Sequence, residues 1–369
     1  MINVFSPKIG ISDIISVLKT LIKNEISGTS PIVGEFEEQI AKKFNRKHAI
    51  AVSNGSVALD LAFQSLGLND DDEVIIPSFT IISCLSAVVR TGATPIFCDV
   101  DRNTWNMSLR DIEKLVTKKT KAILIVHLYG LTAEAKKIED YCVSNGITLI
   151  EDSAEAHGQF ESARACGSFG LISTMSFYAN KHVTTGEGGV VLTDDDEVKN
   201  KIKQMRNLDF TNKKRFYHDN LFWNYRLGGL QAALGISQLS KLEKTIGQKI
   251  KQAGIYDKYL SNSNKISLPV KNIGETKNHY WVYGVVLNQE GIRDLVMDEL
   301  YQQEVETRPF FGPMHLQDAL PVAHRQNVTL PNTEHISENG LYLPLGKHLT
   351  KKDQKYIAEK LLNILDKNS

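Results

Sequence analysis

Short apolar runs alternate with amphipathic segments along the first two-thirds of the chain. The apolar runs predict strands at residues 48–52, 73–77, 94–98, 121–127, 147–151, 171–177 and 188–193. Helical spacing of apolar residues predicts helices near residues 11–24, 36–44, 56–67, 80–91, 108–117 and 132–145. Strands that are apolar throughout and alternate with helices are typical of a mostly parallel sheet covered on both faces. The pattern therefore predicts an α/β fold.

The pattern changes in the last third of the chain, beyond about Asn224. The predicted elements there are a long helix, a β-rich run, a shorter helix and an amphipathic C-terminal helix, at residues 228–261, 280–287, 291–302 and 350–366. This succession is typical of a small α+β domain. We therefore expect a large α/β domain over residues 1–245 and a small C-terminal domain over residues 246–369.

The charges of the chain balance, because Lys and Arg together number 43 and so do Asp and Glu. Such a chain has no overall bias toward nucleic acids or anionic membranes, and no apolar run approaches the roughly 18 residues that span a bilayer. The 4 cysteines form no CxxC pair, which leaves a metal site or a disulfide framework unsupported. The N-terminus does not have the pattern of a secretory signal. We expect a cytoplasmic protein with reduced thiols, no nucleic-acid partner, no membrane association and no metal.

Ligands in parallel α/β sheets bind at the carboxyl ends of the strands, so the loops there are the candidate sites. The loop after the strand at 48–52 reads Ser53-Asn54-Gly55-Ser56 and opens a helix. A helix N-terminus offers unpaired backbone N–H groups and a partial positive charge. Gly55 would let the backbone approach an anion, and Ser56 adds a hydroxyl. A phosphate site is one interpretation, and an ordinary helix cap is the other; this motif alone favours the cap.

The acidic segment EDSAEAHG, at residues 151–158, begins at the end of the strand predicted at 147–151. An Asp at a strand end can form a salt bridge with the protonated ring nitrogen of a pyridine cofactor, which makes the ring an electron sink. Asp152 has this position, Ala154 is small enough for a flat ring to lie close, and Glu155 could reach the ring substituents. A capping Asp in a polar turn is the simpler alternative.

Lys181 lies between an apolar strand and a glycine-rich turn, in the segment SFYANKHVTTGEGG that starts at Ser176. A lysine amine can form an imine with an aldehyde, and burial or neighbouring cations lower its pKa and so free it as a nucleophile and base. A single lysine is more often a solvated surface residue. Here the three signals follow successive strands in the order expected of a pyridoxal-phosphate (PLP) site, and together they favour that chemistry.

The segments SNGS, EDSAEAHG and SFYANKHVTTGEGG together resemble the sugar aminotransferases of the DegT/StrS type, which are fold-type I PLP enzymes. The similarity extends over nearly the whole chain and includes TWNMS, HLYG, WNYR and ETRP, which begin at Thr104, His127, Trp223 and Glu306. It implies a mostly parallel mixed sheet sandwiched by helices, with a smaller C-terminal α+β domain. It also implies a homodimer, or a larger homo-oligomer, with shared active sites.

The resemblance implies a role for each matching residue. Lys181 would be the catalytic residue that binds the cofactor as an imine and moves the proton between the amino-acid carbon and the cofactor. Asp152 would pair with the ring nitrogen, and Glu155 would lie near the ring hydroxyl. The cofactor phosphate would be bound by Gly55, Ser56 and Ser176, and by Asn224 of the neighbouring subunit.

The resemblance also shows one position at which this sequence differs from the family pattern, and it identifies the residues expected near the substrate. At the position of Ile81 the family usually has an aromatic residue that stacks on the cofactor ring, so stacking is expected to weaken to apolar contact unless Phe79 compensates. The residues expected near the substrate are Ser27, Gly28, His218, Arg308 and His315.

Among members of the family, the sequence is most similar to those that aminate C4 of GDP-4-keto-6-deoxymannose with glutamate as the donor. This implies an enzyme that transfers an amino group to a nucleotide-linked keto-sugar for surface polysaccharide synthesis, with the nucleotide, the stereochemistry and the choice of C3 or C4 left open. The alternatives are a UDP- or dTDP-sugar aminotransferase, a sugar 3-dehydratase and a non-enzymatic regulator. The dehydratases have His where the aminotransferases have Lys, and alignment of Lys181 rather than His182 with that position favours transfer. Lys181, Asp152 and the phosphate motif together argue against a regulator.

Overall fold

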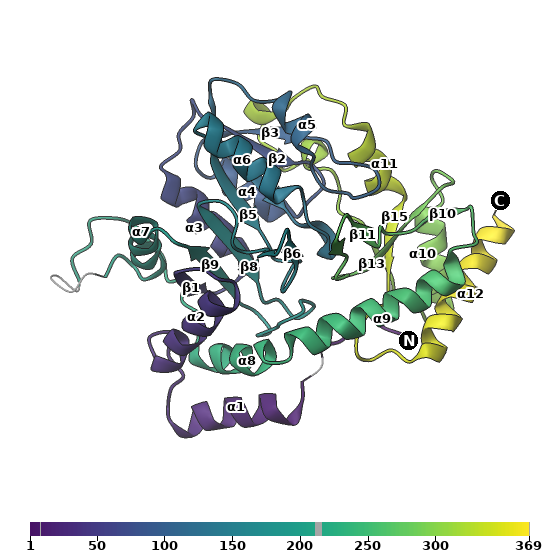
Figure 1. Cartoon of the computed structure of the whole chain (residues 1–369), viewed down its shortest axis with the longest axis horizontal. Coiled ribbons are helices and arrows are strands. Elements are labelled where there is room, and N and C mark those ends of the chain that lie inside the picture. Colours follow the sequence, from purple (N-terminus) through teal and green to yellow (C-terminus); the bar gives the residue numbers. More distant parts are fainter. Residues whose placement is uncertain (8, 211–215, 369) are drawn as a thin grey trace.

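The computed structural model describes residues 1–7, 9–210 and 216–368. Within these residues the central element is a seven-stranded sheet with the order β1-β9-β8-β5-β4-β2-β3 (Figure 1). Its strands are β1 (His48–Val52), β2 (Glu73–Pro77), β3 (Thr94–Cys98), β4 (Thr120–Val126), β5 (Thr148–Asp152), β8 (Ile172–Ser176) and β9 (Gly189–Thr193). Strand β9 is antiparallel to β1 and β8, and the other neighbours are parallel. The expected mostly parallel mixed sheet is confirmed.

Helices cover both faces of this sheet because successive side chains of a strand point to opposite faces. In β1, Ile50 and Val52 pack with α3 and α7 on one face, whereas Ala49 and Ala51 pack with α2 and α8 on the other. These four helices are α2 (Pro31–Lys43), α3 (Gly55–Leu66), α7 (Asp196–Arg206) and α8 (Gly229–Leu239). The predicted helices near 80–91, 108–117 and 132–145 are observed as the shorter α4 (Ile82–Val89), α5 (Leu109–Glu113) and α6 (Ala135–Asn145).

A smaller antiparallel sheet forms the C-terminal part, with the order β10-β13-β15-β14. These strands are β10 (Ile266–Ser267), β13 (Tyr283–Leu287), β14 (Arg308–Pro309) and β15 (Gly340–Leu343), and the two small hairpins are β6–β7 (Phe160–Glu161, Arg164–Ala165) and β11–β12 (Asn272–Ile273, Thr276–Lys277). The helices of this part are α9 (Leu242–Leu260), α10 (Arg293–Gln302), α11 (Pro331–Asn339) and α12 (Lys351–Lys367). The N-terminus also lies here (Figure 1), since Ile2 bridges to Val305 and packs on this second core.

The prediction of a single helix over residues 228–261 is wrong. The chain forms two successive helices, α8 and α9, separated at Ser240 and Lys241 (Figure 1). The break lets α8 pack against α1 and α2 while α9 packs against α12. Leu242 and Ile246 at the start of α9 belong to the core of the large sheet, and the end of α9 belongs to the C-terminal core. Because α9 joins both cores, the domain boundary near residue 245 stays a prediction.

Helix α1 (Ile11–Ile22) has an inverted arrangement of polar and apolar residues. Its buried residues are Asp13 and Thr20, and Asp13 accepts hydrogen bonds from Gln238 at 2.9 Å and from Lys241 at 2.6 Å. Its aliphatic residues point away from the chain; Ile22 is 80% exposed. The predicted amphipathic helix is confirmed, with its polar face inward. None of the helices in the described ranges is long and apolar enough to cross a membrane.

Candidate active site

A cavity of about 540 Å³ opens at the carboxyl ends of β1, β2, β4, β5 and β8. The predicted cofactor residues that line it are Gly55, Ser56, Ile81, Asp152, Glu155, Ser176 and Lys181. Trp281, Phe311 and Tyr342 close it from the C-terminal part. The structure therefore brings together groups from five strand ends that are far apart in the sequence, as the parallel topology requires.

The N-terminus of α3 forms one end of this cavity. The Asn54 side chain caps the helix by accepting a hydrogen bond from Val57 N at 2.9 Å. A Cβ on residue 55 would lie 2.7 Å from the Ser176 Cβ, so only glycine lets the two loops approach this closely. The Ser56 hydroxyl lies 2.6 Å from that of Ser83. Backbone N–H groups at a helix start, together with these hydroxyls, fit a phosphate group.

Asp152 lies at the end of β5 with its carboxylate at the cavity wall. Ala154 N donates to Oδ1 at 2.9 Å, and the Cys84 thiol donates to Oδ2 at 3.6 Å. Burial raises the pKa of Asp152, and burial likewise raises the pKa of Cys84, which keeps the thiol protonated as a donor. A buried carboxylate of this kind needs a cationic partner. The protonated ring nitrogen of PLP fits that requirement.

Lys181 extends into the same cavity, where its Nζ lies 3.5 Å from Glu155 Oε1 and 3.8 Å from the centre of the Trp281 ring. Burial lowers the pKa of Lys181, although Glu155 and Asp152 favour its charged form. Glu155 also accepts a hydrogen bond from Tyr129 N at 2.9 Å, and burial raises its pKa to about 7. The amine is therefore enclosed and held beside two carboxyl groups, an arrangement suited to a lysine that binds an aldehyde.

Ile81 lines the cavity and is 42% exposed. Phe79 is fully buried and packs instead on Tyr129, with ring centroids 5.8 Å apart, so it does not supply the missing stacking partner. The aromatic residues that do line the cavity include Trp281 and Phe311, as well as Tyr178 and Tyr342. No local pattern in the sequence indicates the first two rings, because Trp281 lies 100 residues after Lys181 (281 minus 181) and Phe311 lies 130 residues after it (311 minus 181).

Asn224, Ser27 and Gly28 lie outside this cavity but close to one another. A Cβ on Gly28 would lie 2.6 Å from the Arg226 Cβ, and Gly229 N donates to Ile26 O at 3.0 Å. Asn224 and Ser27 are exposed on this part of the surface. Their predicted roles at a cofactor phosphate and a sugar of another subunit stay predictions.

The three remaining predicted substrate residues also do not line the cavity. His218 is exposed, with its ring 5.4 Å from that of Phe210. Arg308 pairs with Glu306 and lies opposite the cavity residue Tyr342 in the β14–β15 ladder, which puts it beside the cavity. His315 is buried, and both ring nitrogens already have partners, the Ser78 hydroxyl at 2.7 Å and Glu334 at 3.2 Å. The contacts of His315 therefore join two loops. Substrate binding by His218, Arg308 and His315 stays a prediction.

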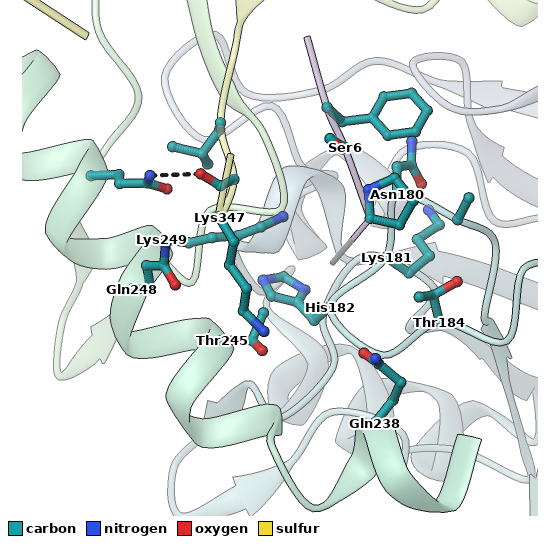
Figure 2. A pocket seen from close by; sticks show the side chains of 16 residues that line it. Ser6, Asn180, Lys181, His182, Thr184, Gln238, Thr245, Gln248, Lys249 and Lys347 are labelled. Carbon is teal, nitrogen blue, oxygen red and sulfur yellow. Dashed lines mark hydrogen bonds between the residues drawn. The ribbon is translucent and has the colours of Figure 1, made fainter. Parts of the chain in front are cut away.

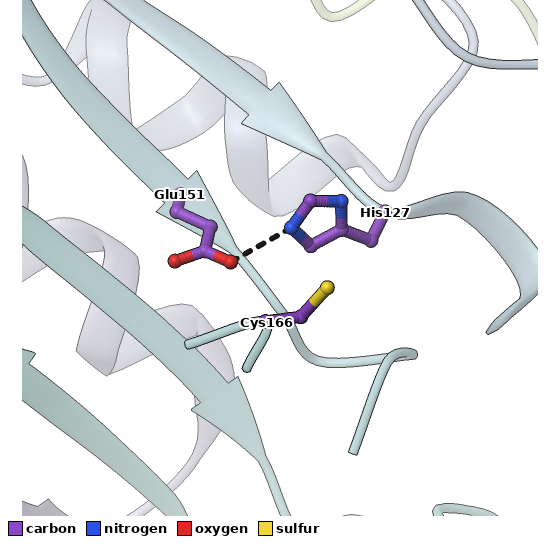
Figure 3. A group of neighbouring side chains, drawn as sticks. All are labelled: His127, Glu151 and Cys166. Carbon is purple, nitrogen blue, oxygen red and sulfur yellow. Dashed lines mark hydrogen bonds and ion pairs between the residues drawn. The ribbon is translucent and has the colours of Figure 1, made fainter. Parts of the chain in front are cut away.

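His127, Glu151 and Cys166 form a buried cluster with the geometry of a possible metal site (Figure 3). Ala133 N donates to His127 Nδ1 at 3.1 Å, so Nε2 carries the ring proton and donates to Glu151 at 2.7 Å. Gly167 N also donates to Glu151, at 2.6 Å. Burial opposes the charge of Glu151, but its bond with His127 and these donors hold its pKa below the ordinary value. The cluster is thus a satisfied hydrogen-bond network beneath Asp152.

Comparison with known proteins identifies the family of the chain. Over residues 9–362 the sequence matches the DegT/DnrJ/EryC1/StrS aminotransferase family. The chain belongs to this family. It is a PLP-dependent sugar aminotransferase.

Two relatives and one solved structure show how far the similarity extends. The GDP-perosamine synthase of Vibrio cholerae is 36% identical, with 85% of this chain and 82% of that protein covered. The dTDP-4-dehydro-2,3,6-trideoxy-D-glucose 4-aminotransferase of Saccharopolyspora spinosa is 31% identical, with 97% and 95% covered. The aminotransferase TlmJ from Streptoalloteichus hindustanus superposes with a TM-score of 0.93 at 27% identity and covers 99% of its chain and 100% of this one. The similarity of the aminotransferase to TlmJ therefore extends over nearly the whole of both chains.

Proposed function

We propose that this aminotransferase moves an amino group from glutamate to C4 of a nucleotide-linked 4-keto-6-deoxy sugar, and that GDP-4-keto-6-deoxymannose, which would give GDP-perosamine, is its best substrate. The observation that carries the reaction is the cavity in which Lys181 faces Asp152, with Gly55 and Ser176 at its phosphate end. The similarity to GDP-perosamine synthase supports GDP-4-keto-6-deoxymannose as the substrate. Because the chain is also similar to a dTDP-sugar aminotransferase, the identity of the nucleotide is what the experiment has to test.

Each side chain has a defined task in this proposal. PLP, when bound, supplies the aldehyde and the electron sink. The Lys181 amine, whose pKa burial lowers, would bind the aldehyde and would take up the proton of the amino-acid carbon. Asp152 would hold the positive charge on the ring nitrogen, and the start of α3 would hold the phosphate. Trp281, Phe311 and Tyr342 keep water from the reacting atoms.

The position of His182 supports transfer over 3-dehydration. His182 is buried outside the cofactor cavity, with its Nε2 3.3 Å from the carbonyl of His279. Lys181 rather than His182 therefore faces the cofactor, and lysine is the residue with which aminotransferases transfer the proton.

We also propose that the working unit is a homodimer in the cytoplasm. The outward aliphatic face of α1 and the surface that carries Asn224 and Gly28 support a second copy of this chain as the partner. The four buried free thiols are consistent with a reducing compartment.

The experiment is a panel of GDP-, UDP- and dTDP-linked 4-keto sugars offered with glutamate, read by mass spectrometry. We expect the GDP sugar to be converted fastest, with the keto oxygen replaced by an amino group and 2-oxoglutarate formed in equal amount. A faster reaction with a UDP or dTDP sugar would replace the substrate, and a 3-deoxy product would replace the reaction. Lys181→Ala should lose both the yellow colour of the bound cofactor and turnover; full turnover by this variant would refute the role of Lys181.

A further inference from the structure

A second cavity, of about 50 Å³, shares Asn180 and Lys181 with the cofactor cavity (Figure 2). Its walls come from the N-terminal residues 5–7, from α8 and α9, and from residues 345–347 before α12. In the view of Figure 2, the Lys249 side chain extends from α9 toward the loop that carries Lys181. The two lysines therefore face one enclosed space, whose described lining residues include neither Asp nor Glu.

Lys249 is buried without a counter-charge. It is 8% exposed, and its ammonium donates to the carbonyl of Trp281 at 2.7 Å. In the described chain no carboxylate lies within ion-pair distance of its Nζ. Burial, together with the charges of Lys181 and Lys347, lowers the pKa of Lys249 to about 7. A buried unpaired cation costs several kcal/mol, so an apolar side chain would serve stability better at this position.

Trp281 connects the two lysines. Its carbonyl accepts the hydrogen bond from Lys249, and its ring lies 3.8 Å from Lys181 Nζ. Its indole N–H donates to the carbonyl of Asn180 at 3.1 Å, which fixes the residue next to the catalytic amine. Lys249 thus holds the backbone of the residue that supports Lys181.

We propose that Lys249 is a positioning residue for Lys181: its hydrogen bond to the Trp281 carbonyl holds the residue that supports the catalytic amine, and its positive charge favours the uncharged form of that amine. The physical basis is that a nearby like charge disfavours the charged form of an amine. The inference rests on the proposed role of Lys181.

The other charged groups around the pair set the direction of the effect. Glu155, Asp152 and the Cys84 thiol favour the charged form of Lys181 and so oppose Lys249. On the side of Lys249, Lys347 repels its charge, and His182 and His157 are buried neutral rings whose pKa burial depresses. Because the pKa of Lys249 is about 7, its charge is present below about pH 7 and fades above it.

The test is the rate at which apoenzyme combines with PLP, followed by the absorbance of the lysine-bound cofactor from about pH 6 to about pH 9. Lys249→Gln keeps an uncharged donor and removes the charge, whereas Lys249→Arg keeps the charge. We expect Lys249→Gln to react roughly three- to tenfold more slowly below pH 7, as expected for loss of a charge in a partly hydrated interior, and to approach the wild type at the alkaline end. Lys249→Arg should match the wild type below pH 7 and react faster than the wild type at the alkaline end, because arginine keeps its charge there. Lys355→Met on the exposed face of α12 serves as the control.

A wild-type profile for Lys249→Gln would overturn the inference, and so would equal slowing in Lys249→Gln and Lys249→Arg, which would indicate lost packing alone. If neither variant folds, Lys347→Gln removes the second cation of the same cavity; a shift in the same direction supports the charge effect, and none refutes it. Lys181→Ala separates the two proposals, because a yellow complex in that variant would refute the role of Lys181 itself, whatever Lys249 does.

Discussion

Lys181 and Glu155 face each other in the cofactor cavity, where Lys181 Nζ lies 3.5 Å from Glu155 Oε1. Both residues are buried, and burial raises the pKa of Glu155 from 4.5 to about 7. The folded chain therefore holds the Glu155 proton more tightly than the unfolded chain does. This contributes stability that is fully present below about pH 4.5 and is lost as the pH rises through about 7.

We predict that Glu155→Gln removes this pH dependence from the apoenzyme. Between pH 5 and pH 8 the unfolding free energy of the wild type should fall relative to that of Glu155→Gln by at most about 3 kcal/mol, at ~1.4 kcal/mol per pKa unit. Urea denaturation at several pH values measures the difference, with the exposed Glu38→Gln as the control. Parallel curves for wild type and Glu155→Gln would contradict the prediction.

At the scale of residues, the sequence predicts best the groups that directly follow a strand. Gly55, Asp152 and Lys181 could be found because each lies in a loop next to a recognisable apolar run, and the parallel topology brings those loops together. Trp281 and Tyr342 could not be found, because their place in the cavity depends on how the C-terminal part packs against the large sheet. No local pattern encodes that packing.

At the scale of elements, a buried arginine holds the turn that leads into β8. Arg46 donates to the carbonyls of Gly167 at 3.0 Å, Phe169 at 2.6 Å and Gly170 at 3.0 Å, and to the hydroxyl of Ser173 at 2.9 Å. Glu151 and its partners satisfy the N–H groups of the same turn. The start of the strand that leads to Lys181 is therefore fixed by two side chains of opposite charge.

Arg46→Met should destabilise the protein by about 3–5 kcal/mol, because it leaves several buried carbonyls and a hydroxyl without a donor. Thermal and chemical denaturation measure the loss. Arg90→Met, which removes an arginine that is 58% exposed and paired with Asp60, should cost less than about 1 kcal/mol. Equal losses in the two variants would show that the buried network adds nothing.

Most elements follow the periodicity of the sequence, but the sequence did not predict α7 and α11, and one predicted helix is divided in the structure. Residues 228–261 keep helical spacing throughout, and neither Gly nor Pro marks the break at Ser240 and Lys241. The break exists because α8 has to pack under α1 and α2 while α9 crosses to the second core. A requirement of tertiary packing overrides the local preference for a continuous helix there.

At the scale of the whole molecule, the aliphatic face of α1 is an apolar surface that a single chain leaves uncovered. Leu18 lies in its middle and is 49% exposed. The Leu18→Glu substitution should weaken self-association roughly 30- to 1000-fold, because burying an unpaired charge in an interface costs about 2–4 kcal/mol. Sedimentation velocity measures the change, and Val143→Glu, at an aliphatic residue of α6 that is 77% exposed, is the matched control. A wild-type chain that is monomeric at every concentration would exclude the dimer.

The antiparallel strand β9 has a consequence for how the protein is made. Strand β1 lies at the edge of the sheet, and its Val52 pairs with Gly189, which is 137 residues further along (189 minus 52). At about 5–20 residues per second, a ribosome needs roughly 7–27 s to synthesise that interval. During this time the nascent segment around Gly55 has no strand to complete its ladder. Translation that stops before β9 should therefore release a chain that cannot retain the cofactor, even though every glycine and serine of its phosphate loop has been made.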